Sequence, residues 1–541
     1  MKKLLLVIAS LSLACLSPPT GRAARGAKGR PAHRAAVEAY LNEITAQGRY
    51  GGAVLVARGG RVLLSRGYGS ADLEAGEPNG PRSQFGIGTL TQQFTAAAVL
   101  MLQERGRLSV RNSVCKFLDG CPPAWRDVTL HHLLTHTSGV PDFAGPGAAA
   151  ADEAAARARP LEFEPGSRLR HGETNYVLLG EVVARASGQS FETFVRRNIL
   201  RPLKMNETAF GGAEAPPKGR AASYVKRGVE SVRTPPRDDP RRAASSGLYS
   251  TVGDLFRWAE AFNAGVLVSR ATLRAMLTAH KENFGYGWYV DEKFGLRRFS
   301  GGGAIYGYTS FLAHFPRHRT TIIVLSNHST NPVLVAGRLT NILLGEHMTD
   351  PPARGFDPSA LGDYVGRYVV ESQVLTNFVI DITGEGGRLY FKPSHNPRQR
   401  LVPAGPDEFY DVDDVGDTVL HFRRDRGGRV SGLTVVENQD VVHASKTSLP
   451  PPSLRGNTTF RLKGYPEAKV VALAGSFNGW NQSELLFGRV GDEWVCRTDL
   501  APGRYAYKFV IDGNWTPDPE NPSTENDGAG NINSVIVVPQ F

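Results

Sequence analysis

Hydrophobic positions follow two different spacings along the chain, and the change between them divides it into segments. Before residue 350, short apolar runs alternate with longer stretches whose apolar residues recur at helical spacing. These patterns predict strands at 53–57, 62–65 and 322–325 and helices at 91–104 and 176–186. Gly59-Gly60 separates the first two strands as a hairpin turn does, and Gly106 and Gly188 end the helices. Residues 35–350 are therefore expected to form an α/β domain.

The later part of the chain contains only patterns typical of strands. Pro351-Pro352 marks a linker, and 357–448 consists of short strands with glycine turns, such as 388–391 and 430–436. Pro450-Pro451-Pro452 precedes 455–541, which again shows only strand patterns. We predict two all-β domains here. With the α/β domain they make three, as expected for 541 residues at roughly 100–200 residues per domain.

The first residues have the pattern of an export signal. Lys2-Lys3 precede a mostly apolar run at 4–14, so residues 1–15 are predicted as a signal segment. The protein is then expected in the periplasm, in the cell envelope or outside the cell. Two alternatives stay open for Cys15: it is lipidated after cleavage and anchors the protein, or it is discarded with the signal. Residues 16–34, rich in Gly, Ala, Pro and Arg, predict a flexible basic linker.

The positive charge of the chain does not indicate nucleic-acid binding. The formal net charge is +11, but residues 1–34 hold seven basic side chains and no acid, which leaves +4 for the rest of the chain. That remainder is of mixed sign and forms no basic stripe interleaved with aromatic residues, so no nucleic-acid partner is expected. Beyond the first twenty residues no apolar run is long enough to span a bilayer, so the only expected membrane contact is a lipid on Cys15.

Three further cysteines remain. Cys115 and Cys121 are close together in a segment that contains Gly120 and Pro122. In an oxidising compartment they are expected to form a disulfide, and the alternative is two buried thiols. Cys496 lies in an alternating strand and is expected to be a small core residue. No group of Cys and His has metal-ligand spacing, so neither a metal site nor a cofactor is expected.

Four phrases in the α/β segment, in this order, resemble the serine β-lactamase and penicillin-binding-protein superfamily, especially its class C-like branch. They are Leu133-Leu134-Thr135-His136-Thr137-Ser138-Gly139, Asn175-Tyr176-Val177-Leu178-Leu179-Gly180, Arg201-Pro202-Leu203-Lys204-Met205 and Ser246-Gly247-Leu248-Tyr249-Ser250-Thr251. The resemblance implies an antiparallel sheet between helical layers. It also implies three catalytic motifs, which must be located residue by residue because a fold does not carry an activity.

The first two motifs of the family are both replaced. Ser-x-x-Lys, in which the lysine takes the proton of the serine nucleophile, falls on Thr89 and Gln92. A glutamine amide cannot act as a base near neutral pH. The Tyr-x-Asn motif falls on His171 and Glu173.

The third motif, Lys/His-Ser/Thr-Gly, falls on Gly301-Gly302-Gly303. A shift of one or two positions brings in Ser300 or Phe299, but no lysine or histidine.

The three replacements lead to two competing interpretations. In the first, the domain is a pseudoenzyme, because catalytic residues act as a unit and all three motifs are altered. It would then be a non-catalytic binding or scaffolding unit. In the second, Thr89 is a nucleophile and His171 its base, helped by Glu173, in an esterase or peptidase built anew on the old scaffold. Either interpretation allows a peptidoglycan-like or ester small molecule in the cleft.

The two later domains also resemble known modules. Gly362-Asp363-Tyr364-Val365-Gly366-Arg367-Tyr368 is similar to the opening of a small lipocalin-like β-barrel that is often appended to such hydrolases. Gly475-Ser476-Phe477-Asn478-Gly479-Trp480 and the phrases after it resemble the glycogen-binding domain of AMP-activated kinase β subunits and carbohydrate-binding module family 48.

The second resemblance implies an immunoglobulin-like β-sandwich that binds an α-glucan such as glycogen or maltodextrin. The family's stacking tryptophans fall on Trp480 and Trp515, and its polar partners on Lys508 and Asn533. Flat aromatic rings suit the C–H faces of sugars, while the hydroxyl rim needs donors and acceptors.

Overall fold

The fold was obtained as a computed structural model. It describes residues 22–142, 157–211, 219–227, 230–235, 239–328, 330–350, 355–371, 379–393, 398–413, 418–437, 440–447, 452–468, 470–482, 484–512, 514–526 and 532–539. The expected signal segment and Cys15 lie outside these residues. Among the described residues, no helix is both long enough and apolar enough to cross a bilayer.

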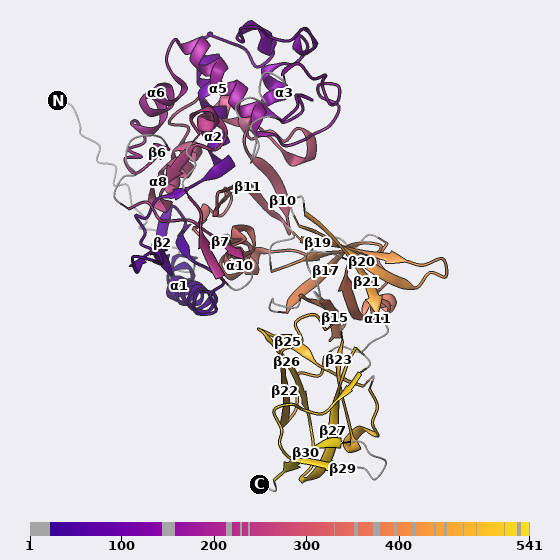
Figure 1. Cartoon of the computed structure of the whole chain (residues 1–541). Helices are drawn as coiled ribbons and strands as arrows, with labels where there is room; N and C mark the ends of the chain where they lie inside the picture. The colour runs from indigo at the N-terminus through magenta and orange to yellow at the C-terminus, as the bar shows by residue number, and fades with distance from the viewer. Residues whose placement is uncertain are drawn as a thin grey trace, which may run out of the picture.

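The large domain is built on one antiparallel sheet that joins strands from both ends of the segment (Figure 1). Its order is β10 (Tyr289–Lys293), β11 (Leu296–Ile305), β12 (Tyr308–Phe315), β13 (Thr320–Ser326), β1 (Gly52–Arg58) and β2 (Arg61–Tyr68). The predicted hairpin is β1–β2, and the predicted buried strand lies in β13. The α/β prediction with an antiparallel sheet is therefore confirmed.

Alternate residues of the central strands enter two different cores, which explains why these strands are apolar throughout. In β1, Leu55 packs into the core that contains the helices α2 (Gln92–Glu104), α5 (Glu173–Ser187) and α8 (Val252–Ala264). Its neighbour Val54 points to the other face and packs with α1 (Arg22–Ala46) and α10 (Pro332–Leu344). Because a strand exposes successive side chains to opposite faces, a sheet covered by helices on both sides needs apolar residues at every position.

Helix α1 corrects the prediction for residues 16–34. The structure begins the helix at Arg22, so most of the segment expected to be a flexible linker is helical. Alanine and arginine have high helix propensity. The helix continues into Val37, Leu41 and Ile44, which recur at helical spacing and are buried against the sheet.

The middle domain is a closed barrel of eight strands, each paired with the next along the chain. The strands are β14 (Gly366–Val370), β15 (Val379–Glu385), β16 (Arg388–Pro393), β17 (Gln399–Gly405), β18 (Glu408–Asp411), β19 (Thr418–Arg424), β20 (Val430–Glu437) and β21 (Asp440–Thr447). Inward residues such as Leu420 and Leu433 fill its core. The predicted small β-barrel is thus confirmed.

The C-terminal module consists of two sheets packed face to face. One contains β22 (Thr458–Lys463), β26 (Glu493–Thr498) and β25 (Gly488–Val490). The other contains β24 (Leu485–Leu486), β23 (Val471–Gly475), β27 (Gly503–Ile511), β30 (Ile532–Val538) and β29 (Thr524–Asn526), with β28 (Asn514–Thr516) beside β27. Cys496 lies in the core between the sheets, where burial raises the pKa of its thiol to about 12.

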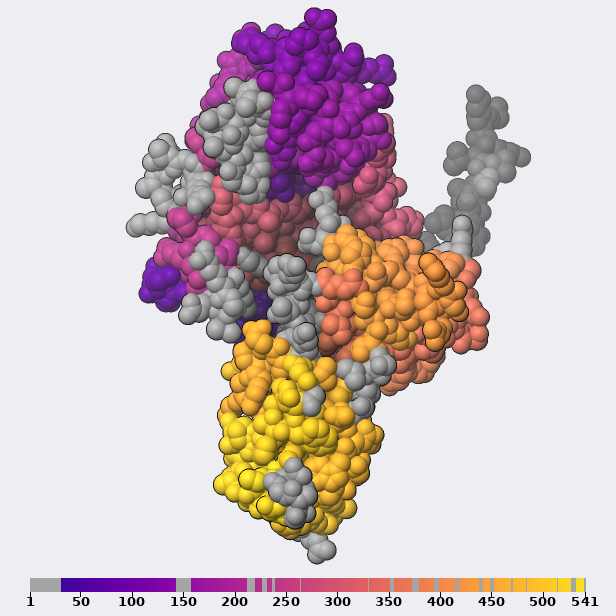
Figure 2. Space-filling model, turned by 45° about the vertical axis from the view of Figure 1, so that its right-hand side comes forward, coloured from indigo at the N-terminus to yellow at the C-terminus, as the bar shows by residue number. Residues whose placement is uncertain are grey.

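The barrel is docked against the large domain, whereas the C-terminal module forms a separate lobe (Figure 2). Phe294, in the turn between β10 and β11, packs with Val402 and Val412 of the barrel. Arg338 of α10 forms an ion pair with Asp413 beside this cluster. These contacts place the outer surface of the barrel next to the strands that line the cleft described below.

Candidate functional site

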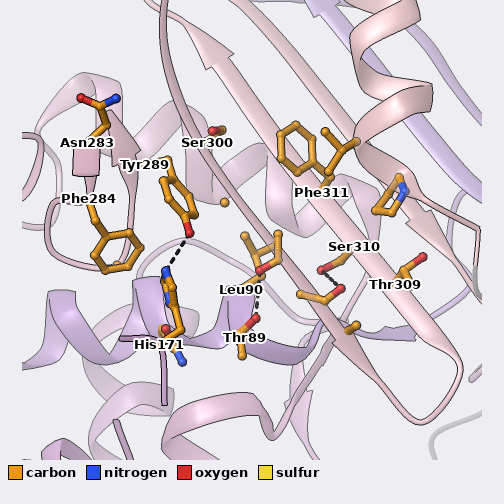
Figure 3. A pocket seen from close by; sticks show the side chains of 18 of the residues that line it. Thr89, Leu90, His171, Asn283, Phe284, Tyr289, Ser300, Thr309, Ser310 and Phe311 are labelled. Atoms are coloured by element: carbon orange, nitrogen blue, oxygen red, sulfur yellow. Dashed lines mark hydrogen bonds between the residues drawn. The ribbon is translucent and has the colours of Figure 1, made fainter. Parts of the chain in front are cut away.

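The cleft of the large domain lies between the start of α2, the loop before α5 and strands β10 and β11 (Figure 3). It has a volume of about 870 Å³ and is lined by Thr89, Gln92, His171 and Glu173, among others. The four residues aligned with the family's first two motifs are therefore brought to one cavity. The glycine run aligned with the third motif, on β11, lines the same cavity.

Thr89 sits in the short 3-10 helix η1 (Gly88–Thr91) that leads into α2, pressed against β11. Its hydroxyl donates to the carbonyl oxygen of Gly302 at 3.0 Å. Close packing needs the glycines there: a Cβ at Gly303 would lie 2.2 Å from the carbonyl oxygen of Ile87. The Thr89 proton is thus held by a backbone carbonyl rather than by a basic side chain.

Gln92 is the last member of a chain of hydrogen bonds between uncharged side chains. Ser138 Oγ donates to Asn175 Oδ1 at 2.6 Å, and Asn175 Nδ2 donates to Nδ1 of His136 at 3.1 Å. Since Nδ1 of His136 accepts, its Nε2 carries the proton and donates to Oε1 of Gln92 at 3.1 Å. Burial, followed by the nearness of His171, lowers the pKa of His136 well below its usual range. The position that holds a cation in the family is therefore part of an uncharged network.

His136, the central residue of this network, has an unusual backbone conformation. Its φ is +55°, a region that non-glycine residues rarely enter. The peptide groups around it are held by hydrogen bonds, with the N–H of Arg170 donating to the His136 carbonyl oxygen at 2.9 Å. From sequence, His136 is expected to be structural, and its bond to Gln92 was missed because the two residues lie 44 positions apart.

His171 is paired with Tyr289, not with Thr89 (Figure 3). The phenol of Tyr289 lies 2.7 Å from Nε2 of His171. Burial lowers the pKa of His171 to about 4 and raises that of Tyr289 to about 12, so both groups are neutral near pH 7. Tyr289 was not singled out from sequence, where it is one of four aromatic residues between 284 and 289.

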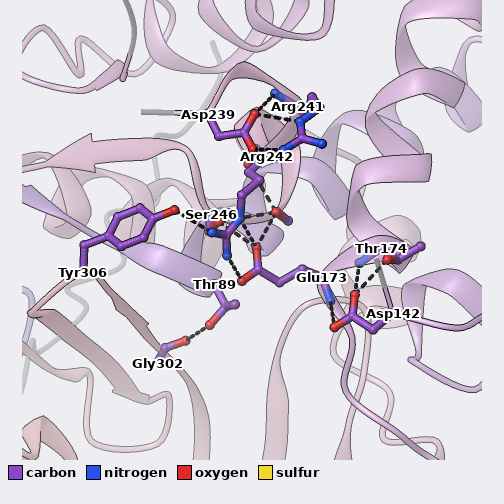
Figure 4. A network of polar contacts seen from close by, with 11 residues as sticks. Thr89, Asp142, Glu173, Thr174, Asp239, Arg241, Arg242, Ser246, Gly302 and Tyr306 are labelled. Atoms are coloured by element: carbon purple, nitrogen blue, oxygen red, sulfur yellow. Dashed lines mark hydrogen bonds and ion pairs between the residues drawn. The ribbon is translucent and has the colours of Figure 1, made fainter. Parts of the chain in front are cut away.

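Glu173 is fully occupied by four donors (Figure 4). Its carboxylate accepts from Nε and Nη2 of Arg242 and from the hydroxyls of Ser245 and Ser246, each hydroxyl at 2.8 Å. The ion pair is buried, with side-chain exposures of 8% for Arg242 and 11% for Glu173. All four donors come from Arg242, Ser245 and Ser246, and none comes from His171.

The hydrogen bonds therefore do not form the relay expected by the hydrolase interpretation. Among the described residues, none joins Thr89 to His171 or His171 to Glu173. The three side chains share the cleft, but each has a different partner. The motif spacing pointed to residues that line one cavity but could not reveal these partners.

Cys115 and Cys121 are joined by a disulfide, with their Cα atoms 5.2 Å apart. Neither residue belongs to the cleft lining. The described residues contain no cluster of His, Cys, Asp and Glu suited to a metal ion.

The C-terminal module places the four residues expected to bind sugar on or beside one face of a sheet. On β27, Lys508 alternates with the core residues Tyr507 and Phe509 and so points away from the core. Val510 points the same way. It packs with Trp480 and lies opposite Trp515 in the strand pairing.

One indole ring is presented by a turn and the other, that of Trp515, by the short strand β28. Gly479 and Trp480 both have positive φ, and the N–H of Trp480 donates to the carbonyl oxygen of Gly475 at 2.9 Å. The ring centroids of Trp480 and Trp515 lie 6.2 Å apart with an interplanar angle of 48°. Trp515 is 44% exposed, whereas Lys508 and Asn533 are 9% and 5% exposed. Two aromatic faces thus stand beside two largely buried polar groups.

Comparison with known proteins agrees with this division of the chain. Residues 34–346 match the β-lactamase family, and residues 457–541 match the glycogen recognition site of AMP-activated protein kinase. Penicillin-binding protein 4* of Bacillus subtilis is 27% identical over 407 residues, which cover 67% of this chain and 88% of that protein. The putative penicillin-binding protein PbpX of the same organism is 27% identical over 307 residues, which cover 56% of this chain and 75% of PbpX.

Among solved structures, an octameric penicillin-binding protein homologue from Pyrococcus abyssi is 25% identical with a TM-score of 0.54. The match covers 76% of this chain and 99% of the homologue. FmtA from Staphylococcus aureus, at 20% identity and a TM-score of 0.52, shares the fold over 58% of this chain and 90% of FmtA. The chain therefore belongs to the β-lactamase family and carries a C-terminal module of the glycogen-recognition type.

Proposed function

We propose that this chain is a non-hydrolysing binding protein that attaches to an α-glucan through its C-terminal module. The observation that carries the proposal is the state of the Ser-x-x-Lys positions. Gln92 Oε1 accepts a hydrogen bond from the neutral His136, and the Thr89 hydroxyl donates one to a backbone carbonyl. Acyl transfer by this family's chemistry needs a base that takes the proton of the nucleophile, and none of the described residues is a base bonded to Thr89.

The module supports the second half of the proposal. Its two tryptophans offer faces on which sugar rings can stack, and Lys508 and Asn533 supply polar groups next to them. The β-lactamase-like domain would then be a binding or scaffolding unit held at a glucan surface.

Export is part of the same proposal. It is supported by the apolar run at 4–14 behind Lys2-Lys3 and by the disulfide between Cys115 and Cys121, a bond that persists in oxidising compartments. Cell fractionation of the full chain, beside a chain that starts at Arg22, tests it. We expect only the full chain outside the cytoplasm, and an equal distribution of both would contradict export.

The catalytic half is tested by turnover. The purified full chain is incubated with a chromogenic cephalosporin and a p-nitrophenyl ester, beside Thr89→Ala and the control Thr309→Ala, a second threonine that lines the cleft. We expect the three proteins to give the same rate. Turnover that disappears only in Thr89→Ala would establish a threonine hydrolase and overturn the proposal.

A further inference from the structure

The cleft has a second wall that belongs to the barrel. Val419 and Val436 line the cavity together with Phe311, Pro332 and Val333 of the large domain. Contacts between the domains fix this arrangement: Asp413, which precedes β19, pairs with Arg338 of α10. Pro332 is the first residue of the same helix. The cavity is therefore completed by two domains rather than contained in one.

The valines of this wall are on the outside of the barrel. In β19, Leu420 and Phe422 are buried in the barrel core, so Val419 points outward. It lies opposite Val436 in the strand pairing, and Val436 lies opposite Val441 of β21, which is 53% exposed. The three form one apolar row across adjacent strands. Further along the same face the outward pair is His421 and Thr434, which is polar.

The charges that are buried at the polar end of the cleft are paired with each other. Arg298 is paired with Asp291, with side-chain exposures of 6% and 10%, and Glu173 is paired with Arg242. His171 and Tyr289 are neutral near pH 7 because of their burial. The side-chain oxygen of Gln92 accepts a hydrogen bond from His136. Its amide nitrogen, which can donate to a ligand, has no partner among the described residues.

These observations describe one cavity with a neutral hydrogen-bonding end and an apolar end. Its volume of about 870 Å³ suits a small molecule rather than a protein segment. Among the described residues that line the cleft, the buried charges are already paired, and transfer of a ligand's charge from water is costly without a countercharge.

We infer that the cleft binds an uncharged small molecule with an aliphatic tail, whose neutral amide or ester end meets Gln92 and whose tail lies on Val419 and Val436 of the barrel. This rests on the part of the proposed function that makes the cleft a binding site. It does not depend on the absence of turnover. The barrel is then a part of the binding site that selects for an apolar group.

The test uses three probes and isothermal titration calorimetry on the full chain. N-octanoylglycinamide has a neutral end and a long tail, N-acetylglycinamide lacks the tail, and N-octanoylglycine replaces the neutral end by a carboxylate. We expect N-octanoylglycinamide to bind at least tenfold more tightly than either of the others. Equal affinity for the octanoyl and acetyl amides, equal affinity for the acid, or no binding of N-octanoylglycinamide would overturn the inference.

The barrel wall is tested with Val436→Asp and with the isosteric Val436→Thr, which keeps the shape of the side chain. Val369→Asp is the matched control, because Val369 is an exposed valine of the same barrel, at 42%, that does not line the cleft. We expect at least a tenfold loss of affinity in Val436→Asp, a smaller loss in Val436→Thr and a change below twofold in Val369→Asp. Equal effects of Val436→Asp and Val369→Asp would overturn the role of the barrel. Release of glycinamide that requires Thr89 would instead overturn the proposed function and leave the barrel wall in place.

Discussion

The cleft of the large domain and the outer face of the C-terminal module use their polar and aromatic groups in opposite ways. In the cleft, Thr89 donates a hydrogen bond to a backbone carbonyl, and Glu173 accepts hydrogen bonds from neighbouring side chains. In the module, Trp515 is 44% exposed, and its ring centroid lies 6.2 Å from that of Trp480. The cleft's polar groups are thus bonded within the domain, whereas an aromatic ring of the module is open to solvent.

Residues of the large domain that pack in its core keep the family's sequence, whereas residues at the motif positions in the cleft do not. Asn175 and Tyr176 keep the family's phrase because they hold the domain together: Tyr176 donates to the carbonyl oxygen of Leu134 at 2.8 Å in the core. Gln92 and His171 carry no comparable family signature, since they replace residues that acted on a substrate. Packing therefore preserves the resemblance independently of the chemistry in the cleft.

The largest expected effect is on stability and concerns Arg242. The substitution Arg242→Ala leaves the buried Glu173 carboxylate without its cation, which should cost about 3–5 kcal/mol of unfolding free energy. Differential scanning calorimetry, which can follow the large domain separately, measures the shift. Arg185→Ala is the control, because its pair with Asp119 is 60% and 85% exposed and should contribute about 0–1 kcal/mol. Similar losses in the two variants would mean that the cleft's ion pair is not structural.

A second prediction is that the stability of the large domain depends more strongly on pH than that of the C-terminal module. Burial lowers the pKa of His131, His171 and His314 to about 4, whereas a histidine in the unfolded chain titrates near 6.5. Between these values the unfolded chain binds more protons, so the large domain should lose stability as the pH falls from about 6.5 to about 4. The loss at pH 5 is about 2 kcal/mol for a buried histidine such as His171.

Residues 455–541 contain no histidine, so the module lacks this source of acid sensitivity. Calorimetry at pH 7 and pH 5 should show the large domain shifting to lower temperature by more than the module. In His171→Gln the shift should be reduced, and in the control His421→Gln, an exposed position of the barrel, it should be unchanged. A module that loses as much stability as the large domain would contradict the comparison.

The smallest effect in free energy concerns glucan binding. Trp480→Ala with Trp515→Ala removes both stacking faces, and retention of the full chain on immobilised glycogen should fall at least tenfold, or about 1.4 kcal/mol. Val537→Ala is the control, because Val537 is 67% exposed in the same module and should leave retention unchanged. Binding that survives the double substitution would place the glucan site elsewhere.

Much of this architecture could be predicted from sequence, and the reasons are local. The alternation around Cys496 indicated a core strand, and the structure confirms it. The turn Asn478-Gly479 indicated an exposed position for Trp480, but its side chain is partly buried because it packs against Val510. Helix α1 was missed because Gly, Pro and Arg suggested a linker, although its apolar stripe continues to Ile44.

The partners in the cleft could not be predicted, because they are set by tertiary contacts. Glu173 and Arg242 lie 69 positions apart, and His171 and Tyr289 lie 118 apart, with no spacing that links them. The same is true of Val419 and Val436, whose position at the cleft depends on how the barrel docks.

The most direct test of the account is whether Thr89 can be acylated at all. Intact-mass spectrometry of the full chain after prolonged incubation with benzylpenicillin detects an acyl adduct even when it never turns over, with an active penicillin-binding protein run in parallel. The account predicts an unchanged mass, because the Thr89 proton is held by a carbonyl oxygen and Gln92 cannot accept it. An adduct of one β-lactam, mapped by digestion to the peptide that contains Thr89, would contradict it.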